Sequence, residues 1–467
     1  MAPSAVDIDQ TYDIAAKGKA ISQHPWSDPV PFGGDDQWFY IPETKRFDLS
    51  RGSVRKLVVD ADDGIRNHRG VMLDPDLTVL VIIDMQNYFI HPTFRHHPGG
   101  IAAVEPTLKF IQKCREQGIQ VAWLNWGITE HDLKIMPPAV QRGFNRSLVQ
   151  AKGHGWHVGL GAELPDGQGR CLFKGTWNAD IYDPFKEVMT PEDVRFDKAR
   201  MSGLWSPEEP MHKWLRQSGK KTLLFAGVNT DQCLLGTLTD AYSWGWDCIL
   251  IGDCAATMTG LEAQAVCDYN IATNMGFVTD SQAFLAAELK RAEIIPTVID
   301  AFTPKFSMNL TWPSANASTS LGNTLKPGDM QHVPDIIVYD ATPSALKPAK
   351  GMQYTVILTD PDAPSRDNPE WSEMCHWIAT GHPGQPKLTE PVHYKPPGPP
   401  PKTGKHRYVF LLLAPANGTT EELHLQRPAD RKHWGFEHER EGVRKWAQGQ
   451  GLVVVGANFV YSQNEKQ

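Results

Sequence analysis

The sequence predicts an α/β domain, built on a parallel sheet flanked by helices, followed by a second, mostly β domain. From about residue 76 to 285, continuous apolar runs alternate with segments of helical spacing, which is typical of a parallel sheet with helices on both faces. After about residue 290, strand-like segments are separated by Pro-rich stretches. The chain has 467 residues, too many for one hydrophobic core, so two or three domains are expected.

The N-terminal part, residues 1–70, is rich in Pro, Gly, Asp and Trp and has weak periodicity. We expect it to form an arm that packs on the surface or on a partner subunit; the alternative is disorder. The remaining chain is then expected to divide into domains at 71–287 and 288–467.

The first domain opens with the run DLTVLVIIDMQ at 76–86, whose continuous β-branched character suits a buried parallel strand. Segment 104–118 has helical spacing and ends at Gly118, a helix stop signal. The same reasoning predicts further strands at 119–126, 221–228 and 247–257, and helices at 210–219, 233–245 and 261–276.

The second domain is predicted from strand-like segments at 303–312, 353–364, 375–380 and 406–415, with one late helix at 440–451. The join between the domains, residues 288–302, reads as helical and has no Gly/Ser tether. We therefore expect the two domains to be docked against each other.

Composition excludes several classes of function. The net charge of −8 and the absence of a Lys/Arg run argue against nucleic acid as a partner. The seven cysteines lack the paired spacing of a zinc site or a disulfide framework. No apolar run reaches membrane-spanning length, and the N-terminus lacks the pattern of a secretory signal. We expect a cytoplasmic protein that acts on a small molecule.

Two residues fall where a parallel sheet binds its ligands, beyond the carboxyl ends of the strands. Asp84 ends the first strand, and Cys233 follows the third at the start of a helix, where the helix dipole would lower a thiol pKa. A carboxylate can accept the thiol proton, and Lys198 can offset its charge. Backbone N–H groups around Asn229 and Cys233 can form an oxyanion hole. The alternative is that the thiol is inert core and the carboxylate a turn residue.

Residues 76–285 resemble the isochorismatase-like cysteine hydrolase family. The resemblance rests on VLVIIDMQNYF, on the lysine of RFDKARMSGL and on AGVNTDQCLLGTLTDAYSWGWDCILIGDCAA. It implies that Asp84, Lys198 and Cys233 form a catalytic triad, and that the Val228–Asn229 peptide bond is cis. It also implies homo-oligomers and the cleavage of an amide, a ureide or a related acyl bond of a small metabolite through a cysteine thioester.

Some members of that family hold a metal with an Asp and two His after the second strand. Here the segment is LNWGITEHDL, without an Asp-x-His pair, so no catalytic metal and no cofactor are expected. His131 is then a polar residue rather than a ligand.

Two groups near the predicted site admit two interpretations. Four tryptophans either line an aromatic pocket for a flat substrate or pack the core or a subunit interface: Trp123, Trp126, Trp177 and Trp205. Three residues after the first strand either bind a substrate carboxylate or decorate an exposed loop: Arg95, His96 and His97.

The second domain carries polar side chains within otherwise apolar strands. Asp360, His376 and His406 can form an anion-binding pocket; alternatively the aspartates only shape a turn, as for Asp362, and the histidines pack in the core. Residues 288–461 resemble a phosphatidylethanolamine-binding protein domain, through DPDAPSR and GKHRYVF. The resemblance implies a phosphate-type anion pocket that also includes Pro400 and Tyr408. Met374 departs from the family, where an aromatic residue is common.

Three functions fit these patterns. The first is a metal-free cysteine hydrolase fused to a small-ligand binding domain. The second is a two-step biosynthetic enzyme with a further reaction in the C-terminal pocket. The third is a binding or regulatory protein whose hydrolase domain is vestigial. The fold of the second domain does not select among them.

Overall fold

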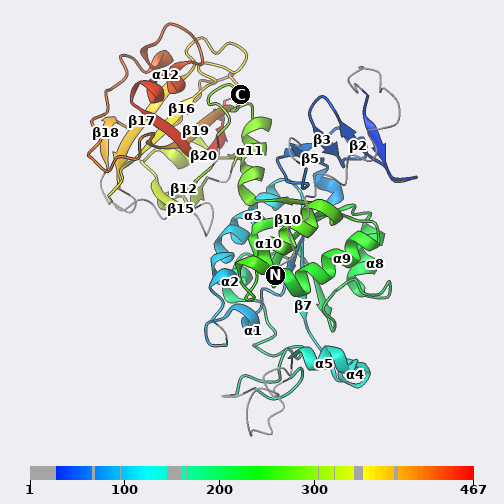
Figure 1. Cartoon of the computed structure of the whole chain (residues 1–467). Coiled ribbons are helices and arrows are strands. Elements are labelled where there is room, and N and C mark those ends of the chain that lie inside the picture. Colours follow the sequence, from blue (N-terminus) through cyan, green and yellow to red (C-terminus); the bar gives the residue numbers. More distant parts are fainter. Residues whose placement is uncertain are drawn as a thin grey trace, which may run out of the picture.

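A computed structural model of the chain describes nine stretches: residues 28–65, 69–94, 96–144, 159–164, 167–302, 304–319, 321–340, 351–382 and 388–466. Figure 1 shows a helix-rich unit, a strand-rich unit and a small N-terminal sheet, with helix α11 (Ser281–Arg291) running between the two large units. Among the described residues, no helix combines the length and the apolar character that crossing a bilayer requires.

The first domain is built on a six-stranded sheet, in which every neighbouring pair is parallel. The predicted parallel sheet is therefore confirmed. Strand β6 lies in the middle of the sheet, between the apolar strands β9 and β7, and all six of its residues are buried. In sheet order the strands are β11 (Phe277–Thr279), β10 (Asp247–Ala256), β9 (Thr222–Val228), β6 (Thr78–Ile83), β7 (Gln120–Trp126) and β8 (Val194–Lys198).

Helices cover this sheet where the periodicity predicts them. The predicted ones are α3 (Val104–Glu116), α8 (Pro210–Ser218), α9 (Leu235–Ser243) and α10 (Leu261–Asn270). The domain also contains short helices that the sequence analysis did not predict: α1 (Asn87–Ile90), α2 (Pro98–Ala102), α4 (Glu130–Ile135), α5 (Pro138–Phe144) and α7 (Asp183–Lys186). Gly219 ends α8 with a left-handed φ of 67°, as a C-terminal glycine does. Helices α3 and α11 pack together through Phe110 and Phe284, whose ring centroids are 4.8 Å apart.

The N-terminal region contains a sheet that the sequence analysis did not predict. Its strands, in sheet order, are β1 (Val30–Phe32), β2 (Trp38–Ile41), β3 (Arg46–Asp48), β5 (Gly70–Leu73) and β4 (Leu57–Val59). Strands of three or four residues are too short to show a period in the sequence. The boundary expected at residue 70 falls on the first residue of β5. Residues 1–27 of the expected arm lie outside the described residues.

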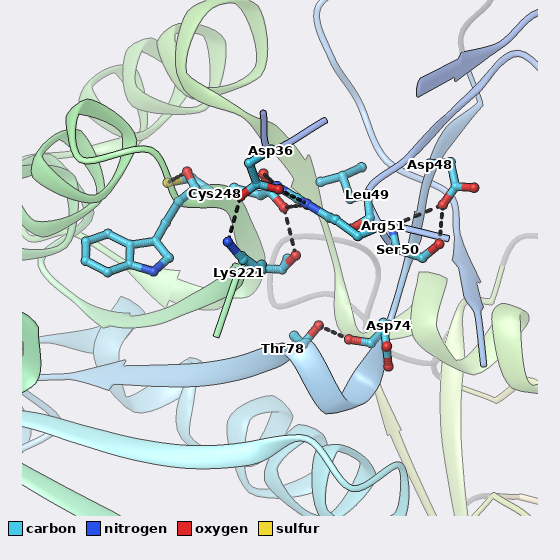
Figure 2. A network of polar contacts seen from close by, with 12 residues as sticks. Asp36, Asp48, Leu49, Ser50, Arg51, Asp74, Thr78, Lys221 and Cys248 are labelled. Atoms are coloured by element: carbon cyan, nitrogen blue, oxygen red, sulfur yellow. Dashed lines mark hydrogen bonds and ion pairs between the residues drawn. The ribbon is translucent and has the colours of Figure 1, made fainter. Parts of the chain in front are cut away.

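A network of polar contacts attaches this small sheet to the central one (Figure 2). Arg51 forms an ion pair with Asp247, the first residue of β10, and donates a second hydrogen bond of 3.0 Å to it. Asp36 accepts hydrogen bonds from both Arg51 (3.0 Å) and Lys221 (2.7 Å). The contacts lie at the amino ends of β9 and β10, the end opposite to Asp84 and Cys233.

The second domain is mostly β, as predicted. A six-stranded sheet has the order β14 (Asn323–Thr324), β20 (Leu452–Ser462), β19 (His406–Pro415), β16 (Tyr354–Asp360), β17 (Met374–Gly381) and β18 (Thr389–Val392), and a second sheet has the order β13 (Ala317–Ser318), β12 (Phe306–Trp312) and β15 (Asp335–Asp340). Two apolar clusters fill the domain. The late helix is α12 (Gly442–Gly449).

The two domains are in contact near α11. The helix runs through the boundary expected at 287/288 and ends at Arg291, so residues 292–302 of the join are not helical, contrary to the prediction. Arg407 of β19 donates a 2.7 Å hydrogen bond to the carbonyl of Ala292, and Lys113 of α3 donates one of 3.1 Å to the carbonyl of Leu321.

Candidate functional site

The structure brings Asp84, Lys198 and Cys233 together at the carboxyl ends of the central strands. Asp84 follows β6, Lys198 is the last residue of β8, and Cys233 lies in a short π-helical turn, η5 (Thr230–Leu234), after β9. The Lys198 Nζ is 3.0 Å from the Asp84 Oδ2, and both side chains are fully buried. Cys233 is buried as well, with 7% of the residue exposed.

The backbone around the site requires a glycine before the cysteine turn. Gly227 has a φ of +114°, and a Cβ there would lie 2.0 Å from the carbonyl oxygen of Ile83. Only glycine lets the end of β9 approach β6 this closely. The Val228–Asn229 peptide bond is cis, as the resemblance implies.

The side chain of Asn229 fixes the cysteine turn through two hydrogen bonds. Its Oδ1 accepts hydrogen bonds from the Met258 amide and from His97 Nε2, both at 3.0 Å. His97 Nδ1 accepts from the Gly100 amide at 2.9 Å, so its Nε2 must carry the proton. His97 is therefore a buried structural residue, and both interpretations of it were wrong. His96 is exposed, and Arg95 lies outside the described residues.

Burial dominates the electrostatics of the thiol. It raises the pKa of Cys233 to about 12, although Lys198 and Trp126 act in the opposite direction. The sequence analysis expected the helix N-terminus to lower this pKa, whereas desolvation, the largest cause, raises it. Burial also raises the pKa of Asp84, against the effects of Lys198 and of the hydrogen bond with Cys233. The resting site thus holds a neutral thiol beside a carboxylate whose proton affinity is increased.

The four tryptophans of the predicted pocket have different positions. Trp126 contacts two residues of the predicted triad: its indole Nε1 donates to the Cys233 Sγ at 3.4 Å, and its ring centroid lies 4.0 Å from the Lys198 Nζ. Trp123 is core, with its indole bound to Asp193 at 2.9 Å. Trp177 and Trp205 are 40% and 49% exposed. One of the four therefore lies at the triad, and one packs as the alternative interpretation had it.

Gln86 is a site residue that the sequence analysis missed. Its Oε1 accepts from the Trp126 amide at 3.0 Å, and its Nε2 donates to the Trp126 carbonyl at 2.7 Å. The side chain is fully buried and joins the ends of β6 and β7. The only signal in the sequence is an amide side chain two residues after Asp84, at the end of the apolar strand.

His131 lies exposed on α4. Among the residues that the structure describes, no group of three or more His, Cys, Asp and Glu has the arrangement of a metal site.

The C-terminal candidates also meet in space. Asp360 ends β16 and His406 begins β19, and the His406 Nδ1 is 2.8 Å from the Asp360 Oδ2. The other ring nitrogen of His406 is 3.0 Å from the Thr403 hydroxyl, which itself donates to the Pro400 carbonyl at 2.7 Å. Each ring nitrogen of His406 therefore has a polar partner, the Asp360 carboxylate on one side and the Thr403 hydroxyl on the other.

Two further ring side chains belong to this cluster. The rings of His376 and Tyr408 meet edge to face with centroids 5.4 Å apart, and Tyr408 also stacks on His406. Burial lowers the pKa of His376 to about 4, so this ring is neutral at physiological pH. Asp362 does more than shape a turn, because it forms a buried ion pair with Arg407 at 2.5 Å.

Comparison with known proteins assigns both domains. Residues 78–283 match the family model of the isochorismatase domain, and residues 315–460 match that of phosphatidylethanolamine-binding protein. Ureidoacrylate amidohydrolase RutB of Methylorubrum extorquens is 30% identical over 232 residues, which cover 46% of this chain and 85% of that protein. The carboxypeptidase Y inhibitor of Saccharomyces cerevisiae is 29% identical over 183 residues, covering 32% of this chain and 82% of that protein.

Among solved structures, the N-carbamoylsarcosine amidase of Thermoplasma acidophilum is 23% identical and covers 44% of this chain and 96% of its own, with a TM-score of 0.33. The chain belongs to the isochorismatase family of hydrolases, and it carries a phosphatidylethanolamine-binding protein domain C-terminal to the hydrolase domain.

Proposed function

We propose that the α/β domain is a cysteine hydrolase that cleaves an amide, ureide or related acyl bond of a small molecule without a metal. The observation that carries the proposal is the fully buried Lys198–Asp84 pair, 3.0 Å apart, next to the Cys233 thiol. Burying a charge pair costs desolvation free energy. Beside a thiol, such a pair can accept the thiol proton. The family's hydrolases support the same class of reaction.

In the first half of the reaction, Asp84 takes the proton of the Cys233 thiol. The sulfur then attacks the substrate carbonyl carbon, and the carbonyl electron pair moves onto oxygen. Lys198 keeps the site electrically balanced as the charge moves. The Asn229 carbonyl accepts hydrogen bonds from the amides of Gln232 and Leu234. We propose that the amide of Cys233, which lies between these two in the sequence, donates a hydrogen bond to the substrate oxyanion.

In the second half, the oxyanion collapses and the C–N bond breaks. Asp84 returns its proton to the leaving amine, which leaves Cys233 as a thioester. Water then gives a proton to Asp84 and attacks the thioester carbon, and the thiol is regenerated with release of the carboxylic acid. The similarity to ureidoacrylate amidohydrolase supports amides and ureides as the first substrates to test.

The test is intact mass spectrometry of the chain incubated with a panel of small amides, ureides, esters and thioesters. We expect an acyl adduct on the wild type and on Cys248→Ala, a control that removes another buried thiol of the same domain. Cys233→Ala and Asp84→Asn should give no adduct. Turnover that survives in Cys233→Ala would overturn the thioester mechanism, and absence of turnover across the panel would favour a vestigial hydrolase.

For the C-terminal domain we propose a pocket for a small anionic ligand of the phosphate type. The observation that favours it is the buried ring of His406, which stacks on Tyr408 and contacts Asp360 and Thr403 through its two nitrogens. Calorimetric titration with inorganic phosphate should give heat in the wild type and not in His406→Gln.

The alternative for this pocket is a second reaction on the product of the hydrolase. Loss of a second product transformation in His406→Gln, with the first step intact, would support the two-step enzyme. Full activity of the α/β domain with no further product would leave the pocket as a binding site.

A further inference from the structure

We propose that Trp126 is a further catalytic residue of the hydrolase site, whose indole N–H stabilises the thiolate of Cys233. The proposal rests on the proposed function, because it assigns the group that supports the nucleophile. It adds a fourth residue to the triad of Asp84, Lys198 and Cys233.

The indole is placed to act on sulfur directly. Its Nε1 lies 3.4 Å from the Cys233 Sγ, and the side chain is 2% exposed. An indole N–H donates and does not accept, so it leaves the thiol proton to Asp84. A donor fixed on the sulfur stabilises the charged form more than the neutral one. The same contact opposes the rise of the Cys233 pKa that burial causes.

The ring of Trp126 also contacts the cation of the site. The Lys198 Nζ lies 4.0 Å from the ring centroid and 3.0 Å from the Asp84 Oδ2. A cation over an aromatic face is attracted by the ring quadrupole, most strongly when water is excluded. One side chain therefore presents its edge to the nucleophile and its face to the lysine, which couples the positions of the two groups.

The surroundings hold this side chain before any substrate binds. The carboxamide of Gln86 binds both the amide and the carbonyl of Trp126. Phe144 packs against the indole with ring centroids 4.9 Å apart. A donor held in position this way needs no reorganisation when charge develops on the sulfur.

The test compares alkylation of Cys233 by iodoacetamide in the wild type and Trp126→Phe, which keeps a ring and removes the N–H. The reaction is followed at the Cys233 peptide by mass spectrometry. A hydrogen bond to a charged group corresponds to a thiolate fraction about tenfold to a hundredfold larger. Higher nucleophilicity of the more basic thiolate offsets about half of this on a logarithmic scale. We expect alkylation about threefold to tenfold slower.

The matched control is Trp123→Phe, on the same strand, which removes a buried indole donor bound to Asp193. It should alkylate at the wild-type rate. An unchanged rate in Trp126→Phe, or an equal loss in both variants, would overturn the proposal.

A second measurement does not require Trp126 to be replaced. In the nitrogen–proton correlation spectrum of the fifteen tryptophan indoles, Cys233→Ala should shift the Trp126 resonance, and an unperturbed spectrum would contradict the contact.

The outcomes separate this proposal from the function itself. If alkylation is slower in Trp126→Phe but no substrate is turned over, the hydrolase function is overturned and the effect of Trp126 on the thiol is supported. If the panel is turned over but the alkylation rate does not depend on Trp126, the hydrolase function is supported and the role of Trp126 is overturned.

Discussion

Among the ion pairs of the described residues, Asp84 pairs only with Lys198. We predict that Lys198→Met lowers the free energy of unfolding by about 3–5 kcal/mol, because it leaves a carboxylate buried without a partner. In this variant, Asp84 would be protonated in the folded state and ionised in the unfolded state. The loss should therefore be smallest below the ordinary carboxyl pKa of about 3.9 and grow as the pH rises above it.

Urea denaturation at acidic and neutral pH measures this. Lys213→Met is the control, because its ion pair with Glu208 is exposed on both sides and should contribute about 1 kcal/mol or less. Equal losses in the two variants would contradict the prediction.

The protonation state of Cys233 makes a second residue-level prediction. With the pKa raised to about 12 in the ligand-free protein, the thiolate fraction grows tenfold with each pH unit through the neutral and mildly alkaline range. We expect the rate of Cys233 alkylation to rise over this range without levelling off. A plateau near neutral pH would show instead a resting thiolate paired with Lys198, and Asp84 would not be needed as the base.

At the scale of elements, the N-terminal sheet depends on the ion pair between Arg51 and Asp247. The Asp247 side chain is 6% exposed, and its pKa is raised by burial and lowered by Arg51. We predict that Arg51→Met lowers the free energy of unfolding by about 3–5 kcal/mol. The network lies at the opposite end of the sheet from Cys233, so turnover per folded molecule should stay at the wild-type level.

Thermal denaturation and turnover of the folded fraction check this together. The control is Arg55→Met, whose pair with Asp76 is exposed on both sides; it should cost about 1 kcal/mol or less. Loss of turnover in folded Arg51→Met would show that the small sheet acts on the site.

The elements also show where sequence patterns reach their limit. The strand at 78–83 lies within the predicted run at 76–86, because six consecutive buried apolar residues leave few alternatives. The strands β1 to β5 were missed, because three or four residues are too few to show a period in the sequence.

At the scale of the whole molecule, Lys113 connects the two domains. It is 5% exposed, lies 3.3 Å from the fully buried Glu288 of α11, and donates to the carbonyl of Leu321 in the second domain. We predict that Lys113→Met uncouples the domains, because Glu288 loses a partner and the carbonyl loses its donor. In calorimetry, the separation between the unfolding transitions of the two domains should increase.

Lys109→Met is the matched control, one turn earlier on α3, where the lysine pairs with Glu105 of its own helix. It should leave the calorimetric profile unchanged. An unchanged profile in Lys113→Met would show that other contacts, such as those of Arg407 with the carbonyls of Ala292 and Glu293 after α11, hold the domains by themselves. A homo-oligomer in the cytoplasm remains a prediction, and sedimentation of the full chain tests the oligomer.

The sequence by itself determined the two fold classes and the positions of the long strands, and it predicted which three residues form the triad. These are encoded locally, in apolar runs, strand-end residues and short motifs around Asp84, Lys198 and Cys233. The tertiary structure alone decided the protonation of the thiol, the burial of His97 and the place of Trp126. Each depends on which groups from distant segments displace water around a side chain, and desolvation has no signature in a local pattern.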